Sequence, residues 1–136
     1  MFALLIHQVL DLHSRVRELL DVYANAGEVV DERKLVDMLR DSHAQPISLL
    51  ARWIVERRIV QVELAGRTYV PLFQFKPARM ELRPVVAEVV RELRQSMDDL
   101  ELAAWFVKPN AILDGLRPVD VVDNEPALLR SAARAV

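Results

Sequence analysis

Residues 31–75 decide the fold, and they read DERKLVDMLRDSHAQPISLLARWIVERRIVQVELAGRTYVPLFQF. Asp31 can begin a helix, because its carboxylate can accept hydrogen bonds from backbone N–H groups two or three residues later. Residues 42–45 break the apolar pattern, and Pro46 suits the first turn of a second helix, where its missing N–H needs no partner. We expect that second helix to run to about Arg58. Two short helices joined by a tight turn form a helix-turn-helix.

The remainder of this stretch has the composition of a β-hairpin. Residues 59–64 are rich in β-branched side chains, residues 65–66 (Ala-Gly) can turn the chain, and residues 68–75 are typical of a returning strand. Pro71 has no amide donor, so we expect the returning strand to lie at the edge of the sheet. A hairpin directly after a helix-turn-helix is a winged arrangement.

Upstream, residues 1–28 predict one amphipathic helix that Gly27 can end. Its apolar residues recur at alternating spacings of three and four, which is a coiled-coil seam held for about three heptads. Such a seam can pair with a helix of a second chain or pack on the core of its own chain. We expect a homodimer through this helix, with packing on its own core as the alternative. The seam residues are Phe2, Leu5, Val9, Leu12, Val16, Leu19 and Tyr23.

Downstream, residues 81–136 predict a series of short helices separated by turns. Prolines can open helices, and the acidic runs 98–101 and 120–125 lie where carboxylates stabilise the positive end of a helix dipole. We expect Asn110 to cap a turn that Gly115 ends, and Asn124 to cap the last helix. The expected segments are 84–97, 100–106, 110–115, 118–122 and 126–136.

The fold class expected from these patterns is mainly α with a small antiparallel β-hairpin. A winged helix-turn-helix-like part would be followed by a helical domain. The expected divisions are an N-terminal helix over 1–28, the helix-turn-helix with its hairpin over 29–80, and the helical domain over 81–136.

Composition excludes several classes of protein. The chain has 136 residues, of which 52% are hydrophobic and 28% charged. The hydrophobic share argues against a disordered protein, and the charged share argues against a membrane protein. Its longest apolar stretches are far shorter than the ~20 residues of a membrane span. The N-terminus lacks the basic start of a signal peptide. We expect a cytoplasmic protein.

Residue types also argue against catalysis. The absence of cysteine removes disulfides, thiol nucleophiles and most structural zinc sites. The three glycines lie far apart, so no phosphate-binding loop is expected. His7, His13 and His43 have no carboxylates at metal-ligand spacing. We therefore expect no metal, no cofactor and no enzymatic activity.

The basic surplus lies in the middle third of the chain. Residues 46–80 contain six basic and two acidic side chains, a net charge of +4, whereas the segments on either side are each at −3. This is where a nucleic-acid contact would lie. If the second helix of the helix-turn-helix reads DNA, its exposed N-terminal residues face the groove and nearby arginines reach phosphates. The DNA-binding candidates are Ser48 and Arg52 for the groove, and Arg57, Arg58 and Arg67 for phosphates.

Two segments resemble a known family. Residues 69–75 read YVPLFQF, and residues 105–122 read WFVKPNAILDGLRPVDVV. Their ordered motifs resemble the Xre/MbcA/ParS-like antitoxin family, whose toxin-binding domain has a Trp, then Pro-Asn, Leu-x-Gly and Pro-x-Asp/Glu. Residues 128–134 (LLRSAAR) look like the last helix of that domain. The resemblance covers residues 60–136. The matching positions are Trp105, Pro109, Asn110, Leu113, Gly115, Pro118 and Asp120.

The resemblance implies a function for the helical domain. Family members of type II toxin–antitoxin systems neutralise a cognate toxin, often a RES-type protein that degrades NAD or an ADP-ribosylating relative, with the tail approaching the toxin's active site. Arginine suits this role, because its planar fork pairs with carboxylates and fits phosphate pockets. The toxin-binding candidates are Trp105, Asn110, Arg117, Asp120, Arg130, Arg134 and Val136.

The resemblance also implies repression of the protein's own operon through the helix-turn-helix. The first 30 residues differ from a usual Xre-type N-terminus, and residues 42–45 contain no glycine. The alternative function is a stand-alone DNA-binding transcriptional regulator without a toxin partner.

Overall fold

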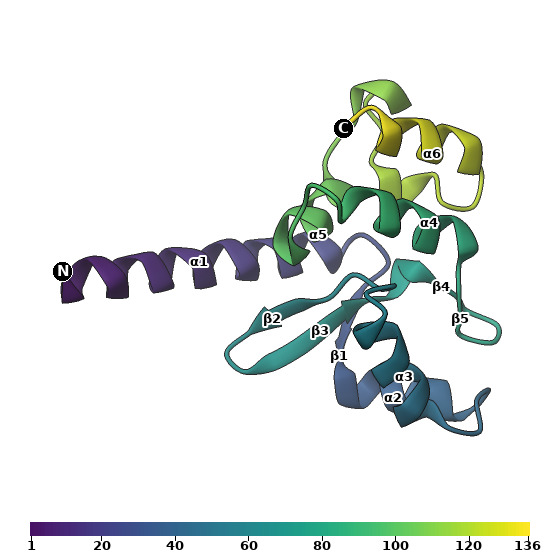
Figure 1. Cartoon of the computed structure of the whole chain (residues 1–136), viewed down its shortest axis with the longest axis horizontal. Helices are drawn as coiled ribbons and strands as arrows, with labels where there is room; N and C mark the ends of the chain where they lie inside the picture. Colours follow the sequence, from purple (N-terminus) through teal and green to yellow (C-terminus); the bar gives the residue numbers. More distant parts are fainter.

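The computed structural model describes all 136 residues, which form six α-helices and a small amount of antiparallel sheet (Figure 1). The protein is thus mainly helical with a small antiparallel sheet, as the sequence predicts. None of the helices is both long enough and apolar enough to cross a membrane. The elements are α1 (Phe2–Tyr23), β1 (Val29–Asp31), α2 (Glu32–Arg40), α3 (Pro46–Val55), β2 (Val62–Leu64), β3 (Arg67–Pro71), η1 (Leu72–Gln74), β4 (Phe75–Lys76), β5 (Glu81–Leu82), α4 (Pro84–Leu93), α5 (Asp99–Val107), η2 (Ala111–Leu113), η3 (Pro118–Asp120) and α6 (Pro126–Arg134).

Helix α1 is attached to the rest of the molecule only through its C-terminal half. Val16, Leu19 and Tyr23 are buried there, where α1 packs against β2 and α5. The Tyr23 hydroxyl donates to the carbonyl of Ala103 at 2.6 Å, and burial raises the pKa of this phenol. The N-terminal half of α1 projects away from the body (Figure 1).

The segment from β1 to β3 forms a three-stranded antiparallel sheet in the order β1-β3-β2. The prediction that the returning strand lies at the edge is wrong, because β1 was not predicted and pairs along its other side, with Val30 opposite Val70. Pro71 is compatible with this central strand because it is the last residue of β3. The predicted strand 68–75 is interrupted by η1, and Phe75 belongs to the separate ribbon β4-β5.

The two helices between β1 and β2 begin where the sequence predicts. Asp31 caps α2 by accepting from the Lys34 N–H at 2.9 Å, and Pro46 is the first residue of α3. Helix α3 ends at Val55, earlier than the predicted Arg58. It ends there because Arg57 takes a left-handed conformation (φ 57°), and the N–H of Arg58 bonds back to the carbonyl of Trp53.

The C-terminal part is built from α4, α5 and α6. Helix α4 ends at Leu93, short of the predicted residue 97, while Asp98 and Glu101 form a capping box for α5. The prediction that Asn124 caps the last helix is wrong: the N-cap position of α6 is Glu125, which makes no side-chain capping bond. Pro126 in the first turn removes one N–H that a cap would otherwise satisfy.

Two apolar clusters hold the molecule together. The larger cluster has 23 buried residues, and Phe106 is fully buried among them. They come mainly from helices α1, α4, α5 and α6, with Val62 of β2 and Phe73 of η1. The smaller has eight buried residues, which pack α2 and α3 on one another and on the sheet; Trp53 and Phe75 lie 5.4 Å apart between ring centroids. Residues of β2 and η1 belong to the larger cluster, so the segment from β1 to η1 shares one core with the C-terminal helices.

Candidate protein-binding surface

Trp105 lies on α5 at the margin of the larger cluster. Its ring is half-buried and meets Phe106 edge-on, with centroids 5.0 Å apart and planes at 89°. Phe106 points inward and Trp105 keeps part of its surface in solvent. Of the motif residues, Trp105 is therefore one that a partner could contact directly.

Asn110 is used by the chain itself. Its side-chain oxygen accepts from the Ile112 N–H at 2.9 Å, so it caps η2 as predicted. Its carbonyl accepts from Gly115, and its own N–H donates to Leu116 at 3.0 Å, which closes the loop 110–116. Gly115 has the left-handed conformation expected of it (φ 85°), as does Asp114 before it (φ 56°). These bonds give Asn110 the role of shaping the loop.

Arg117 and Asp120 are paired with each other across η3. Two nitrogens of the guanidinium donate to the two carboxylate oxygens, at 2.8 and 3.0 Å. This hydrogen bonding to Asp120 raises the pKa of Arg117. A partner that recruits either side chain must compete with this bidentate pair.

Of the two arginines of α6, one is paired with a carboxylate of the chain and the other is not. Arg130 Nε donates to Glu88 of α4 at 2.7 Å, and this bond lowers the pKa of the Glu88 carboxyl, with a further contribution from the charge of Arg134. Arg134 itself is exposed and makes no hydrogen bond or ion pair within the chain. Val136, at the end of the tail, is 61% exposed. Arg134 and Val136 are thus the candidates most available to a partner.

Three further exposed apolar side chains lie on or against α6 and were not predicted as contacts. Ile112 and Leu116 lie on the loop that packs beside α6, and Leu128 lies on α6 itself; all three are between 43% and 54% exposed. They lie on the η2 side of α6, whereas Arg130 and Arg134 line the cleft on its α4 side. In the sequence these residues follow the same apolar spacing as core residues, so no local signal distinguishes them.

A groove rich in arginine separates the end of α3 from α4. It has a volume of about 700 Å³. Arg57 and Arg58, predicted as DNA contacts, line one wall, and Arg91 of α4 lines the other. Arg91 was not predicted, although its place on the exposed side of a helix with Val86 and Val90 inside could have indicated it. The lining residues are Glu56, Arg57, Arg58, Pro84, Ala87, Glu88, Arg91 and Arg94.

Arg94 forms the floor of this groove and ties its two walls together. Its Nε donates to the carbonyl of Arg57 at 3.0 Å, and a second nitrogen donates to the carbonyl of Ile59 at 2.7 Å. The remaining nitrogen pairs with Asp99 at 2.7 Å. The Arg94 side chain is only 9% exposed, so its role is to position the groove rather than to meet a ligand.

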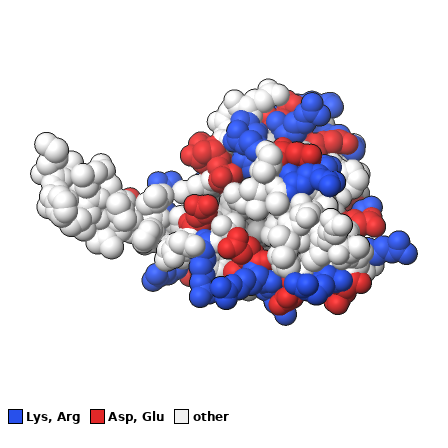
Figure 2. Space-filling view, turned by 60° about the horizontal axis from the view of Figure 1, so that its bottom comes forward, with Lys and Arg blue, Asp and Glu red and all other residues white.

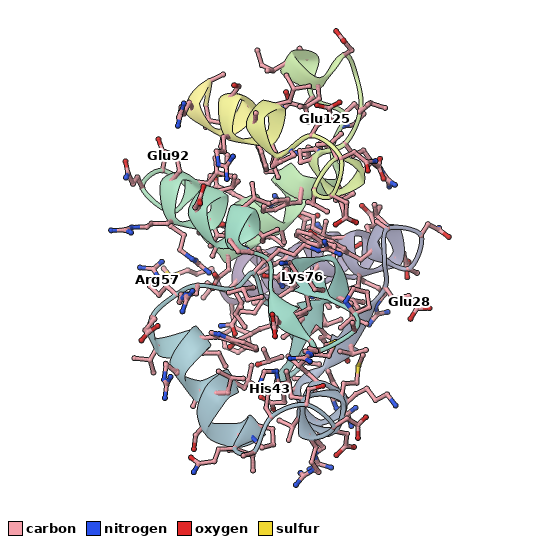
Figure 3. The ribbon with its side chains drawn as sticks, turned by 90° about the vertical axis from the view of Figure 1, so that its right-hand side faces the viewer. Glu28, His43, Arg57, Lys76, Glu92 and Glu125 are labelled. Carbon is pink, nitrogen blue, oxygen red and sulfur yellow. The ribbon has the colours of Figure 1, made fainter.

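The groove continues into the cleft between α4 and α6. Glu88 lines both, and the second cleft also contains Glu92, Arg130 and Arg134. Arg57 and Glu92, from different halves of the sequence, project from the same side of the molecule (Figure 3). The structure therefore joins two predicted DNA contacts, Arg57 and Arg58, to two predicted toxin contacts on one surface. We call this surface the arginine face; it consists of Arg57, Arg58, Arg91, Arg130 and Arg134 with Glu56, Glu88 and Glu92.

The remaining DNA-binding candidates lie elsewhere. Ser48 and Arg52 are exposed on α3, and Arg67, at the tip of the β2–β3 hairpin, lies 3.8 Å from Asp31. Arg57 and Arg58 line the groove beside α4, whereas Arg67 lines a separate hollow with Glu32 and Arg33, so the five candidates do not line one groove. Beside Arg52, the exposed residues Ile47 and Val55 make the outer side of α3 largely apolar.

No family model, no curated protein and no solved structure matches the chain. The resemblance of residues 60–136 to the antitoxin family is therefore an interpretation of the sequence alone.

Proposed function

We propose that the protein is a non-catalytic, antitoxin-like binding protein. Its arginine face, together with residues 134–136 at the end of α6, would bind and neutralise a toxin. The observation that carries this proposal is that Arg91 and Arg134, which line the groove and the cleft of the arginine face, make no hydrogen bond or ion pair within the chain, and that Val136 lies exposed two residues after Arg134. Unpaired guanidiniums on an exposed surface are suited to a partner that presents carboxylates, because the planar fork of arginine pairs with them through two hydrogen bonds. The cytoplasm is the compartment that this function requires.

The charge pattern favours a protein partner over a polyanion on this face. Glu56, Glu88 and Glu92 alternate with the arginines. A phosphate backbone would be repelled by each of these carboxylates, whereas a protein can present complementary charges of both signs. With the sequence resemblance, this favours a toxin of the RES-type NAD-degrading or ADP-ribosylating class, whose active site binds an anionic substrate.

The experiment is co-expression with the product of the adjacent gene, scoring co-purification and growth. We expect a stable complex that restores growth. Arg134→Glu combined with Arg91→Glu should weaken the affinity by roughly 100-fold or more, because two desolvated charge pairs become repulsive. The matched control is Arg33→Glu, an exposed and unpaired arginine on α2. The proposal fails if the double variant binds as the wild type does, or if Arg33→Glu weakens binding equally.

A second candidate function, a DNA-binding regulator, has one observation in its favour. The elements α1–β1–α2–α3–β2–β3 follow the order of a helix-turn-helix with a hairpin wing, and Arg52 lies exposed on α3 without a partner. Binding of the chain's own promoter DNA is expected to fall steeply with salt, and Arg52→Glu should reduce that dependence by about one counterion. A gel shift at two salt concentrations measures this. Arg134→Glu is the control and should leave DNA binding unchanged; equal effects of the two variants would contradict the assignment to α3.

A further inference from the structure

The N-terminal half of α1 exposes more large apolar surface than any other part of the chain. Residues 2–12, which we call the arm, lie outside the body, and residues 1–10 contain no Lys, Arg, Asp or Glu. The arm is accordingly uncharged over nearly its whole length (Figure 2). Its large apolar side chains, each between 46% and 79% exposed, are Phe2, Leu4, Leu5, Ile6, Val9, Leu10 and Leu12.

The arm needs a cover to be helical in water. A helix of this length is marginal by itself, because most helical stability comes from packing of an apolar side. A partner helix lying along the stripe covers Phe2, Leu5, Val9 and Leu12 with Ile6 at their edge, which would remove roughly 350 Å² of apolar surface from water on each arm. Two arms covering one another would therefore bury on the order of 700 Å², and contact of each N-terminus with the partner's body brings the total toward the ~1,200 Å² at which specific interfaces begin.

The arrangement of the apolar stripe on α1 indicates how that cover lies. Phe2, Leu5, Val9 and Leu12 continue, at the same spacing, the stripe that Val16 and Tyr23 bury against the body. From Val16 onward the stripe side of α1 is thus occupied by β2 and α5. Only the arm has its stripe free.

This geometry excludes a parallel pair. Paired helices lie 8–10 Å apart. A second α1 running parallel along the stripe would enter the space that β2 and α5 occupy beyond residue 15. The arm stands clear of the body (Figure 1). An antiparallel α1 that overlaps only the arm therefore avoids the body, because its own body then lies beyond the N-terminus of the first.

We propose that the arm pairs with the arm of a second copy of this chain, antiparallel and in a register that sets Phe2 opposite Leu12 and Leu5 opposite Val9. In this register, each stripe residue of one arm faces a stripe residue of the other arm. Each N-terminus also reaches the body of the partner. An anionic bilayer is a poorer occupant, because the arm has no Lys or Arg to meet its headgroups. The inference stands independently of what the arginine face binds.

The first test is the oligomeric state by sedimentation. The wild type should be a dimer at micromolar concentration, and Leu5→Glu with Val9→Glu should weaken self-association at least 100-fold. The matched control is His7→Glu with Ser14→Glu, on the opposite side of the same helix, which should leave the dimer intact. A monomeric wild type overturns the proposal, as does a monomer that binds neutral lipid vesicles through the arm.

The second test determines the direction of the pair. The chain has no cysteine, so single thiols can be introduced without background. Mild oxidation of a mixture of L5C and V9C chains, distinguished by tags, should give the mixed disulfide, with little from either variant alone. A disulfide within L5C alone and within V9C alone, without the mixed product, would show a parallel pair and overturn the proposed register. A protein that does not dimerise should give no disulfide from any of the mixtures. A dimer in another register should give a disulfide from a different combination of variants, so the two failures are distinguishable.

Discussion

Replacing Gln74 by leucine should lower the free energy of unfolding by roughly 4 kcal/mol. Gln74 is fully buried, and its side-chain oxygen accepts from the Val60 N–H at 2.6 Å. Its amide nitrogen donates to the carbonyls of Val60 and Pro71, both at 2.9 Å. Leucine would leave three backbone groups without partners, and each buried unpaired group costs ~1–3 kcal/mol, partly offset by the apolar side chain. Urea unfolding at constant m-value measures the loss.

The control for this prediction is Gln95→Leu, which makes the same chemical change at an exposed position after α4. It should change stability by no more than about 0.5 kcal/mol. If Gln74→Leu loses less than about 1 kcal/mol, the three backbone groups are satisfied by other means, and Gln74 is not the link between the start of β2 and the end of β3.

Arg94→Met should destabilise the protein by about 3 kcal/mol. Methionine can fill the space of the arginine stem, but it cannot donate to the carbonyls of Arg57 and Ile59 or pair with Asp99. Hydrogen bonds from a charged donor contribute ~1.5–3 kcal/mol each, and part of the loss is offset by not burying a cation. Amide exchange should accelerate at residues 57–60, where the carbonyls are released, alongside the loss in urea unfolding.

Two variants separate this positioning role from the charge itself. Arg94→Lys keeps the charge but not the three-way fork, so it should recover less than half of the lost stability. Arg91→Met, one turn earlier on the same helix and exposed, should change stability by no more than about 0.5 kcal/mol. An Arg94→Lys variant as stable as the wild type would mean that charge alone holds the groove walls.

Local signals located the starts of most helices. Asp31, Pro46, Pro84 and Asp98 act at or beside the first turn of a helix, where a side chain bonds to N–H groups a few residues away or a proline lacks a donor. These effects need no distant partner. They are therefore readable from the sequence.

The sequence-based predictions were wrong where a segment distant in the sequence determines the local structure. The three-residue strand β1 is too short to show alternation and exists because β3 lies beside it. Its presence makes β3 central. The early end of α3 depends on Arg57, whose left-handed backbone is not typical of arginine, and whose carbonyl is held by Arg94 from α4.

The candidate site divides in the same way. Sequence patterns selected Arg57 and Arg58 for one function and Arg130 and Arg134 for another, because they lie more than 70 residues apart along the chain. Neither pattern indicated that α4 would place Glu88 and Arg91 between them. The free guanidinium of Arg134 and the occupied one of Arg130 are also indistinguishable in the sequence, since only the packing of α6 on α4 brings Glu88 to one of them.

By itself, the sequence determined the mainly helical class, the hairpin, most of the helix starts and the apolar stripe of α1, because hydrophobic periodicity and capping act over a few residues. The tertiary structure decided the strand order, which half of that stripe is buried, and the formation of the arginine face. Those features depend on which surfaces meet across long separations, and the same apolar or basic pattern is compatible with either a buried or a free position until the packing partners are known.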